Sequence, residues 1–166
     1  RYWFLCLVFA LLAVVSQSYA QQNREGDIQY RLGQSYERSG DFASAVKAYE
    51  DALKRDPRNF VIIDALKRAY LQLKRYDDAI RFISSQLTNA PNDISYLVEL
   101  GSVYHLKADD QKANEFWNRA IALLPNQEMS YRLVANAMSQ HRLFDQAIAT
   151  FQRGRTALHD PNLFAA

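Results

Sequence analysis

A period of 34 residues runs through most of this 166-residue chain and constrains its fold more than any other feature. Five columns of residues keep the same register over consecutive repeats. Within each column the residues stand 34 positions apart. The columns are Leu32, Leu66, Leu100 and Val134; Tyr36, Tyr70, Tyr104 and Met138; Ala45, Ala79, Ala113 and Ala147; Tyr49, Ile83, Trp117 and Phe151; and Pro57, Pro91 and Pro125. A period of this length is typical of repeat architectures, in which each repeat buries its apolar face against its neighbours.

Each repeat contains two runs of about 13 residues in which apolar side chains recur at helical spacing. The pattern predicts an antiparallel pair of helices. Small residues, such as Gly33 and Gly101 in the first helix, stand where two backbones approach closely, and Tyr36 and Trp117 fill the space between the helices. The proline that closes each repeat disfavours helix at the residue before it, so the second helix is expected to end there.

The register therefore predicts an all-α chain of stacked helix-turn-helix units. One helix pair cannot bury its apolar face alone, so about three repeats are needed for stability. The expected boundaries are a short linker at 21–25, four repeats at 26–59, 60–93, 94–127 and 128–161, and the start of a further, truncated repeat at 162–166. Lys67 takes the glycine column of the second repeat, where we expect its methylene stem to pack while its ammonium reaches water.

These columns resemble the tetratricopeptide repeat (TPR) family, whose pattern is a Leu-Gly pair, a Tyr three residues later, an Ala and a large aromatic residue in the second helix, and a closing Pro. The matching residues are Leu32-Gly33, Tyr36, Ala45, Tyr49, Ala52 and Pro57 in the first repeat and Leu100-Gly101, Tyr104, Ala113, Trp117, Ala120 and Pro125 in the third. The resemblance covers residues 26–161. It implies a right-handed superhelical solenoid whose concave groove is lined by the first helix of each repeat.

The resemblance also implies which residues face that groove. The candidate partner-binding residues are Tyr30, Gln34, Arg38, Asp64, Arg68, Gln72, Ser102, His105, Arg132 and Asn136. Glu37, Val61 and Val98 also fall at groove positions. Among the groove positions the charges balance, with Asp27, Glu37 and Asp64 against Arg38, Arg68 and Arg132, which favours a mixed peptide or a partner helix over a polyanion. For each single residue, an ordinary solvated surface position stays the alternative, because few residues dominate any interface.

The N-terminus has a different composition. Fourteen consecutive apolar residues, from Tyr2 to Val15, follow Arg1, and Ser18 and Ala20 place small side chains before a polar stretch. This is the pattern of a secretory signal peptide at 1–20, cleaved after Ala20. A membrane span needs about 20 apolar residues, so an uncleaved anchor is the weaker alternative. We expect export, to a bacterial periplasm or outer envelope first and to the medium second, and the mature chain would lose Cys6, its single cysteine.

Several kinds of chemistry are disfavoured. The five glycines stand too far apart for the phosphate-binding loops of nucleotide enzymes. A net charge of +2 is too small to favour nucleic acid, and the basic stretch from Lys54 to Arg81 is read first as a solvated face. His105 and Asp109 are four residues apart, which suits a shared metal, but no third ligand has useful spacing. We expect no cofactor, no metal, no catalytic residue and no small-molecule substrate.

The function expected from the sequence is a non-catalytic scaffold that binds a protein or peptide partner in the concave groove. Two alternatives stay open. The repeats could be the recruiting arm of a larger envelope enzyme whose catalytic domain lies beyond residue 166, or an envelope-assembly factor anchored by an uncleaved N-terminus.

Overall fold

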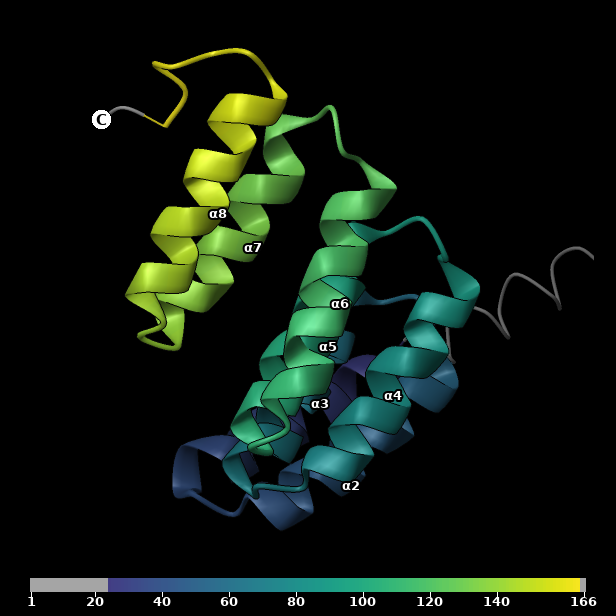
Figure 1. Ribbon diagram of the computed structural model, residues 1–166. Helices are drawn as coiled ribbons and strands as arrows, with labels where there is room; N and C mark the ends of the chain where they lie inside the picture. The colour runs from purple at the N-terminus through teal and green to yellow at the C-terminus, as the bar shows by residue number, and fades with distance from the viewer. Residues whose placement is uncertain (1–23, 165–166) are drawn as a thin grey trace, which may run out of the picture. The chain divides into compact units, whose positions relative to one another are not determined.

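A computed structural model of the chain describes residues 24–164, and these residues form eight helices and no strand (Figure 1). The predicted all-α fold is confirmed. The predicted signal peptide lies outside the described residues. In chain order the helices are residues 24–39, called the first helix below, α2 (Phe42–Arg55), α3 (Phe60–Gln72), α4 (Tyr76–Asn89), α5 (Ile94–Leu106), α6 (Asp110–Leu123), α7 (Glu128–Gln140) and α8 (Phe144–Ala157).

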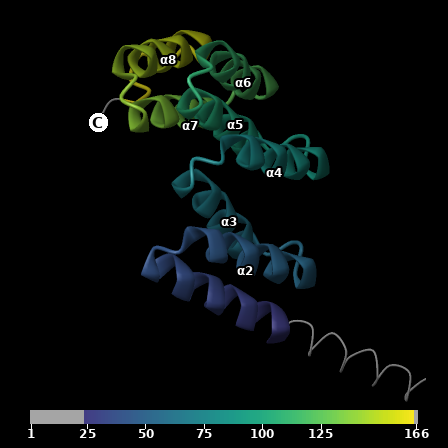
Figure 2. The same ribbon diagram turned by 90° about the horizontal axis from the view of Figure 1, so that it is seen from below.

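The helices group into two compact units, an N-terminal unit that ends at Lys74 and a C-terminal unit that begins at Arg75. The N-terminal unit contains the first helix, α2 and α3, and α2 packs against α3. In the C-terminal unit, α5 and α7 lie side by side, with α6 and α8 forming a second layer over them (Figure 2). The border between the units falls inside the second expected repeat, so the units do not follow the sequence period.

Side-chain caps and left-handed turn residues explain where the helices begin and end. Asp41, Asn59, Asp93 and Asp109 each accept a hydrogen bond from a backbone N–H in the first turn of the helix that follows, which satisfies a group that the helix leaves unpaired. Gln127 precedes α7 and its side chain makes no cap bond.

The turn inside each helix pair uses one position with a left-handed backbone. Gly40, Lys74, Ala108 and Arg142 stand 34 residues apart and have φ values of 80°, 54°, 65° and 63°. Glycine adopts this conformation freely, whereas the three other residues adopt it at a cost. The same backbone turn therefore recurs at each pair although only the first repeat carries the residue best suited to it.

The core follows the sequence columns. All four residues of the alanine column are buried, and so are Tyr49, Ile83 and Trp117 in the large apolar column. A Cβ atom on Gly33 would lie 2.4 Å from the ring of Tyr49, and one on Gly101 would lie 2.4 Å from the ring of Trp117. The glycines are therefore required by close packing against these rings.

The leucine column is not buried throughout. Leu66, Leu100 and Val134 are buried, but Leu32, in the same column, is 40% exposed. The later residues of this column belong to helices that pack against the second helix of the preceding repeat, whereas no helix precedes the first helix within the described residues. Among residues 24–164, no helix is both long enough and apolar enough to span a membrane.

Candidate functional site

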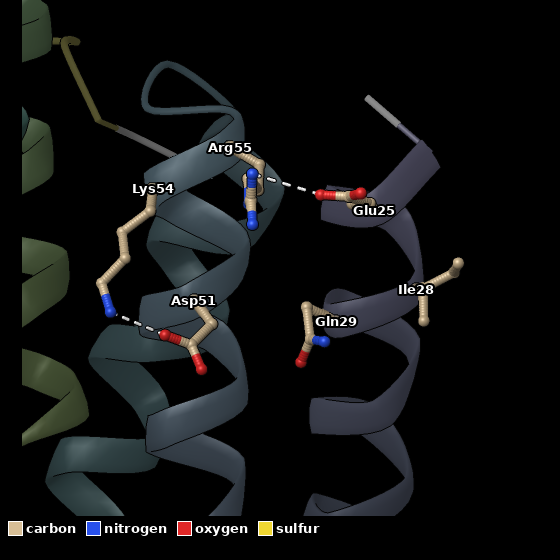
Figure 3. Close-up of a pocket in the computed structure, with 6 residues that line it drawn as sticks. All are labelled: Glu25, Ile28, Gln29, Asp51, Lys54 and Arg55. Atoms are coloured by element: carbon tan, nitrogen blue, oxygen red, sulfur yellow. Dashed lines mark hydrogen bonds and ion pairs between the residues drawn. The ribbon is translucent and has the colours of Figure 1, made fainter. Parts of the chain in front are cut away.

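The first helix and α2 border a surface depression of about 660 Å³ (Figure 3). Its charged groups pair with one another: Arg55 Nη1 lies 3.2 Å from Glu25 Oε2, and Lys54 Nζ lies 2.6 Å from Asp51 Oδ1. Ile28 and Gln29 complete the lining. None of the candidate groove residues lies here, and the depression carries no cluster of groups suited to catalysis.

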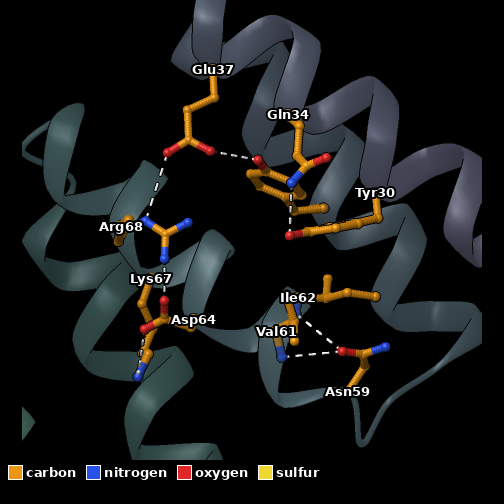
Figure 4. A network of polar contacts seen from close by, with 10 residues as sticks. Tyr30, Gln34, Glu37, Asn59, Val61, Ile62, Asp64, Lys67 and Arg68 are labelled. Carbon is orange, nitrogen blue, oxygen red and sulfur yellow. Dashed lines mark hydrogen bonds and ion pairs between the residues drawn. The ribbon is translucent and has the colours of Figure 1, made fainter.

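Most candidate residues of the N-terminal unit lie around Glu37, near the C-terminal end of the first helix (Figure 4). The Tyr49 hydroxyl donates a hydrogen bond of 2.6 Å to Glu37 Oε2, and Arg68 Nε of α3 lies 3.7 Å from Glu37 Oε1. Burial, and after it the hydrogen bond to Glu37, raises the pKa of Tyr49 well above its usual value. Tyr49 therefore stays a neutral donor that holds Glu37 in place beside Arg68.

Tyr30 and Gln34 form the next part of this surface. Gln34 Nε2 donates a hydrogen bond of 2.9 Å to the Tyr30 hydroxyl, one helical turn away. The ring of Tyr30 lies 5.8 Å from that of Tyr49, at a tilt of 38°. Both Tyr30 and Gln34 are half-buried, so their positions are set by packing before any partner arrives.

Asp64 completes the charged part of this surface from α3. It pairs with Arg68 one turn later, and its Oδ1 lies 3.7 Å from Lys67 Nζ. The Lys67 side chain is only 12% exposed, so its stem is packed, as its place in a glycine column required, while its ammonium is paired with Asp64. About half of the Arg68 side chain is exposed, which leaves it accessible to a partner.

The two other candidates in the N-terminal unit lie at the edge of this network. Arg38 borders a shallow depression of about 250 Å³ together with Gln34 and Glu37. Gln72 is exposed at the C-terminal end of α3. We refer below to Tyr30, Gln34, Glu37, Asp64 and Arg68 as the α3 surface.

In the C-terminal unit, His105 belongs to a cluster of three rings. Its ring centroid lies 5.0 Å from that of His141, in an edge-on arrangement, and 6.2 Å from that of Trp117. Burial, and then the proximity of His105, lowers the pKa of His141, so this imidazole stays neutral around pH 7. His141 follows α7, and the sequence analysis did not connect it with His105 because the two residues are 36 positions apart.

His105 pairs with Asp110 and not with Asp109, the residue four positions after it. His105 Nδ1 lies 2.6 Å from Asp110 Oδ1, while Asp109 accepts a hydrogen bond of 3.1 Å from the backbone N–H of Lys112. Asp109 is the N-cap of α6, and this role directs its carboxylate to the helix end. Within residues 24–164, no group of three or more His, Cys, Asp or Glu side chains is placed to hold a metal ion.

The remaining candidates of this unit differ in exposure. Ser102 is half-buried on α5, while Arg132 and Asn136 are exposed on α7, where Arg132 Nη1 lies 3.2 Å from Glu128 Oε1. Val98, also expected at a groove position, is buried, which corrects that expectation. It belongs to the core cluster around Trp117, whose Nε1 donates a hydrogen bond of 3.2 Å to the Val98 carbonyl.

Comparisons with known proteins agree with this architecture. Residues 36–100 match the family described as "Tetratricopeptide repeat". The chain is 25% identical over 127 residues to the BBSome complex member BBS4 of Bos taurus, which covers 76% of the chain and 24% of that protein. It is 28% identical over 114 residues to Tetratricopeptide repeat protein 21B of Homo sapiens, covering 68% of the chain and 9% of that protein. The chain thus spans about a quarter or less of the length of these relatives.

Solved structures show the same fold at low identity. The crystal structure of MamA has a TM-score of 0.53 and 18% identity, and the match covers 86% of each chain. MamA 41-end from Desulfovibrio magneticus RS-1 has a TM-score of 0.55 and 19% identity, covering 86% of this chain and 78% of that one.

The 34-residue register, the helix pairs and these matches define the class of the molecule, a helical repeat protein of the kind that generally serves as a non-catalytic scaffold for protein binding. Residues 36–100 match the tetratricopeptide repeat family, and both relatives support the resemblance that the repeat columns indicated.

Proposed function

We propose that this chain is an exported scaffold that binds a peptide or a partner helix, and that the α3 surface is a main contact site. The observation that carries the proposal is the network around Glu37. It joins the first helix, α2 and α3 through one hydrogen bond from Tyr49 and one ion pair with Arg68. Side chains held in this way lose little conformational freedom when a partner binds, which favours affinity.

The charges of the α3 surface indicate the kind of partner. Arg68 and Asp64 are both about half exposed and lie side by side. Arg68 offers a positive charge and Asp64 a negative one, and the half-buried ring of Tyr30 lies nearby on the first helix. A peptide or helix that carries an acidic and a basic residue beside an apolar one complements this arrangement, whereas a uniformly charged polymer does not.

The double substitution Tyr30→Ala with Arg68→Glu tests this surface. Peptides are first selected against the unchanged chain from a displayed random library, and the dissociation constant of the tightest one is then measured by isothermal titration calorimetry. We expect the double variant to bind this peptide at least about tenfold more weakly, because loss of an interface arginine or tyrosine commonly costs more than 1 kcal/mol.

Lys47→Glu serves as the matched control for charge, because Lys47 is exposed on α2 and takes no part in the network. This variant should bind the peptide as the unchanged chain does. Helical circular dichroism of all variants should stay the same. Equal peptide affinity in the double variant and the unchanged chain would refute the assignment of the α3 surface.

Export is the second part of the proposal, and it rests on the composition of residues 1–20. When the chain is produced in a bacterial host behind an initiator methionine, we expect it in the periplasmic fraction with an N-terminus at Gln21. Intact-mass spectrometry measures this directly. A product that keeps residues 1–20 and stays with the membranes would instead support the anchored alternative.

A further inference from the structure

The C-terminal unit has a surface depression of about 370 Å³ that none of the candidate groove residues lines. Its floor is Leu97 of α5, which is only 4% exposed. The C-terminal ends of α4 and α6 and the loop after α4 supply the rest of the lining, which consists of Leu87, Pro91, Arg119, Ala122 and Leu123. Helices of two successive repeats build this depression, so its opening does not result from the ends of the described residues. We refer to it below as the Leu97 depression.

The next repeat shows why this space is open. Tyr131 stands 34 residues after Leu97 and is only 3% exposed. Its ring packs against Gly154 of α8, where an added Cβ would lie 3.0 Å from the ring, and its hydroxyl donates a hydrogen bond of 2.9 Å to the Pro125 carbonyl. The proline at the equivalent place beside Leu97 is Pro91. Because leucine is shorter than tyrosine and has no hydroxyl, it leaves unfilled the space that the phenol ring occupies one repeat later.

Arg119 gives the rim of the Leu97 depression a positive charge. Its side chain is exposed, and its guanidinium carbon lies 5.1 Å from the centre of the Phe116 ring. Within residues 24–164, no carboxylate pairs with this guanidinium. Arg153, at the same position of the next repeat, instead donates a hydrogen bond of 2.9 Å to Asn118 Oδ1. A planar guanidinium beside an apolar hollow is suited to a carboxylate that arrives together with an apolar group.

We propose that the Leu97 depression binds a tyrosine side chain of a partner protein, from a segment in which an acidic residue stands beside that tyrosine. The partner's ring covers Leu97 as the ring of Tyr131 fills the equivalent place, its hydroxyl has the Pro91 carbonyl as acceptor, and the neighbouring acid pairs with Arg119. Tyrosine buries a large apolar area while its hydroxyl keeps a polar partner, which makes it a common interface anchor. This site goes beyond the proposed binding on the α3 surface and shares no residue with that surface.

An NMR titration of the isotope-labelled chain with a short capped peptide, Gly-Ser-Asp-Tyr-Asp-Ser-Gly, tests the proposal. At millimolar peptide we expect the backbone amide signals of Leu87, Leu97 and Leu123 to shift, while those of the α3 surface stay in place. A peptide with alanine for its tyrosine should cause no shifts. A peptide with lysine for both aspartates should bind about fivefold more weakly, the effect of losing a favourable surface charge pair.

Two substitutions that fill the depression should abolish binding of the tyrosine peptide. Leu97→Tyr fills it from the floor, as Tyr131 does one repeat later, and Ala122→Phe fills it from an exposed wall without changing the core. Arg119→Glu should weaken binding of the aspartate peptide about fivefold and strengthen binding of the lysine peptide, because the charge pair is restored with its signs exchanged. A merely structural role of Arg119 would not produce this exchange.

Arg153→Glu is the matched control, since Arg153 is exposed at the same repeat position but does not line the depression. It should bind the aspartate peptide as the unchanged chain does. Circular dichroism checks the helix content of each variant, and if Leu97→Tyr loses helix, Ala122→Phe decides the question. Absence of shifts around the depression would overturn the proposal, and so would undiminished binding in Ala122→Phe. Equal weakening by Arg153→Glu and Arg119→Glu would also overturn it, because it would indicate attraction to net charge alone.

Discussion

Replacing Trp117 with alanine is expected to lower the free energy of unfolding by about 3–5 kcal/mol, the range for removing a buried large aromatic side chain. Trp117 is 1% exposed and lies in the core cluster that α5, α6 and α7 share. Its removal also leaves the Val98 carbonyl without the indole hydrogen bond. Urea unfolding followed by circular dichroism at 222 nm measures the loss without depending on tryptophan fluorescence.

Trp117→Phe is the control that separates ring packing from hydrogen bonding. Phenylalanine keeps a large ring in this column but donates no hydrogen bond, so it should cost clearly less than alanine. The hydrogen bond itself contributes about 0.5–1.5 kcal/mol. The core role of the indole ring would be contradicted if Trp117→Ala lowers the free energy of unfolding by less than about 1 kcal/mol, which is far below the range for core aromatic residues.

Replacing Gly101 with alanine is expected to destabilise the chain by about 1–3 kcal/mol, the usual cost of overpacking a core. Alanine in a helix is ordinarily more stable than glycine by about 1 kcal/mol, so the expected sign is the reverse of the helix preference. The added Cβ would lie 2.4 Å from Nε1 of Trp117. The ring cannot shift freely, because it is buried and its N–H is bonded to the Val98 carbonyl.

A double-mutant cycle with Trp117→Ala tests this cause. Without the indole ring the alanine at position 101 meets open space, so in that background Gly101→Ala should become stabilising. Gly40→Ala is the matched control: nothing lies within 4 Å of its added Cβ, but its φ of 80° strains any other residue. Its cost should be the same in both backgrounds. An unchanged cost of Gly101→Ala in the cycle would contradict the close-packing explanation.

Much of the fold could be predicted because its signals are local. Helical spacing of apolar residues and proline at the end of each repeat act within one or two turns, and helices α3, α5 and α7 begin at Phe60, Ile94 and Glu128, the first residues of three expected repeats. The small residues Gly33 and Gly101 indicated close approach before any coordinate showed the rings of Tyr49 and Trp117 against them.

The candidate site was predicted less completely. Tyr30, Gln34, Asp64 and Arg68 lie in one surface, as the repeat positions suggested, but the central role of Glu37 depends on the Tyr49 hydroxyl that reaches it from another helix. The pairing of His105 depended on which neighbouring aspartate caps α6, and spacing alone does not distinguish Asp109 from Asp110.

The sequence by itself determined the helix pairs and their 34-residue register, because periodic apolar residues and helix-ending residues act over short distances along the chain. Only the tertiary structure decided which members of each column are buried, since burial depends on the presence of a neighbouring helix: Leu32 is exposed where Leu66 and Leu100 are covered. It also decided that the chain divides into two compact units between Lys74 and Arg75. That border depends on the sum of long-range contacts, which no single repeat encodes.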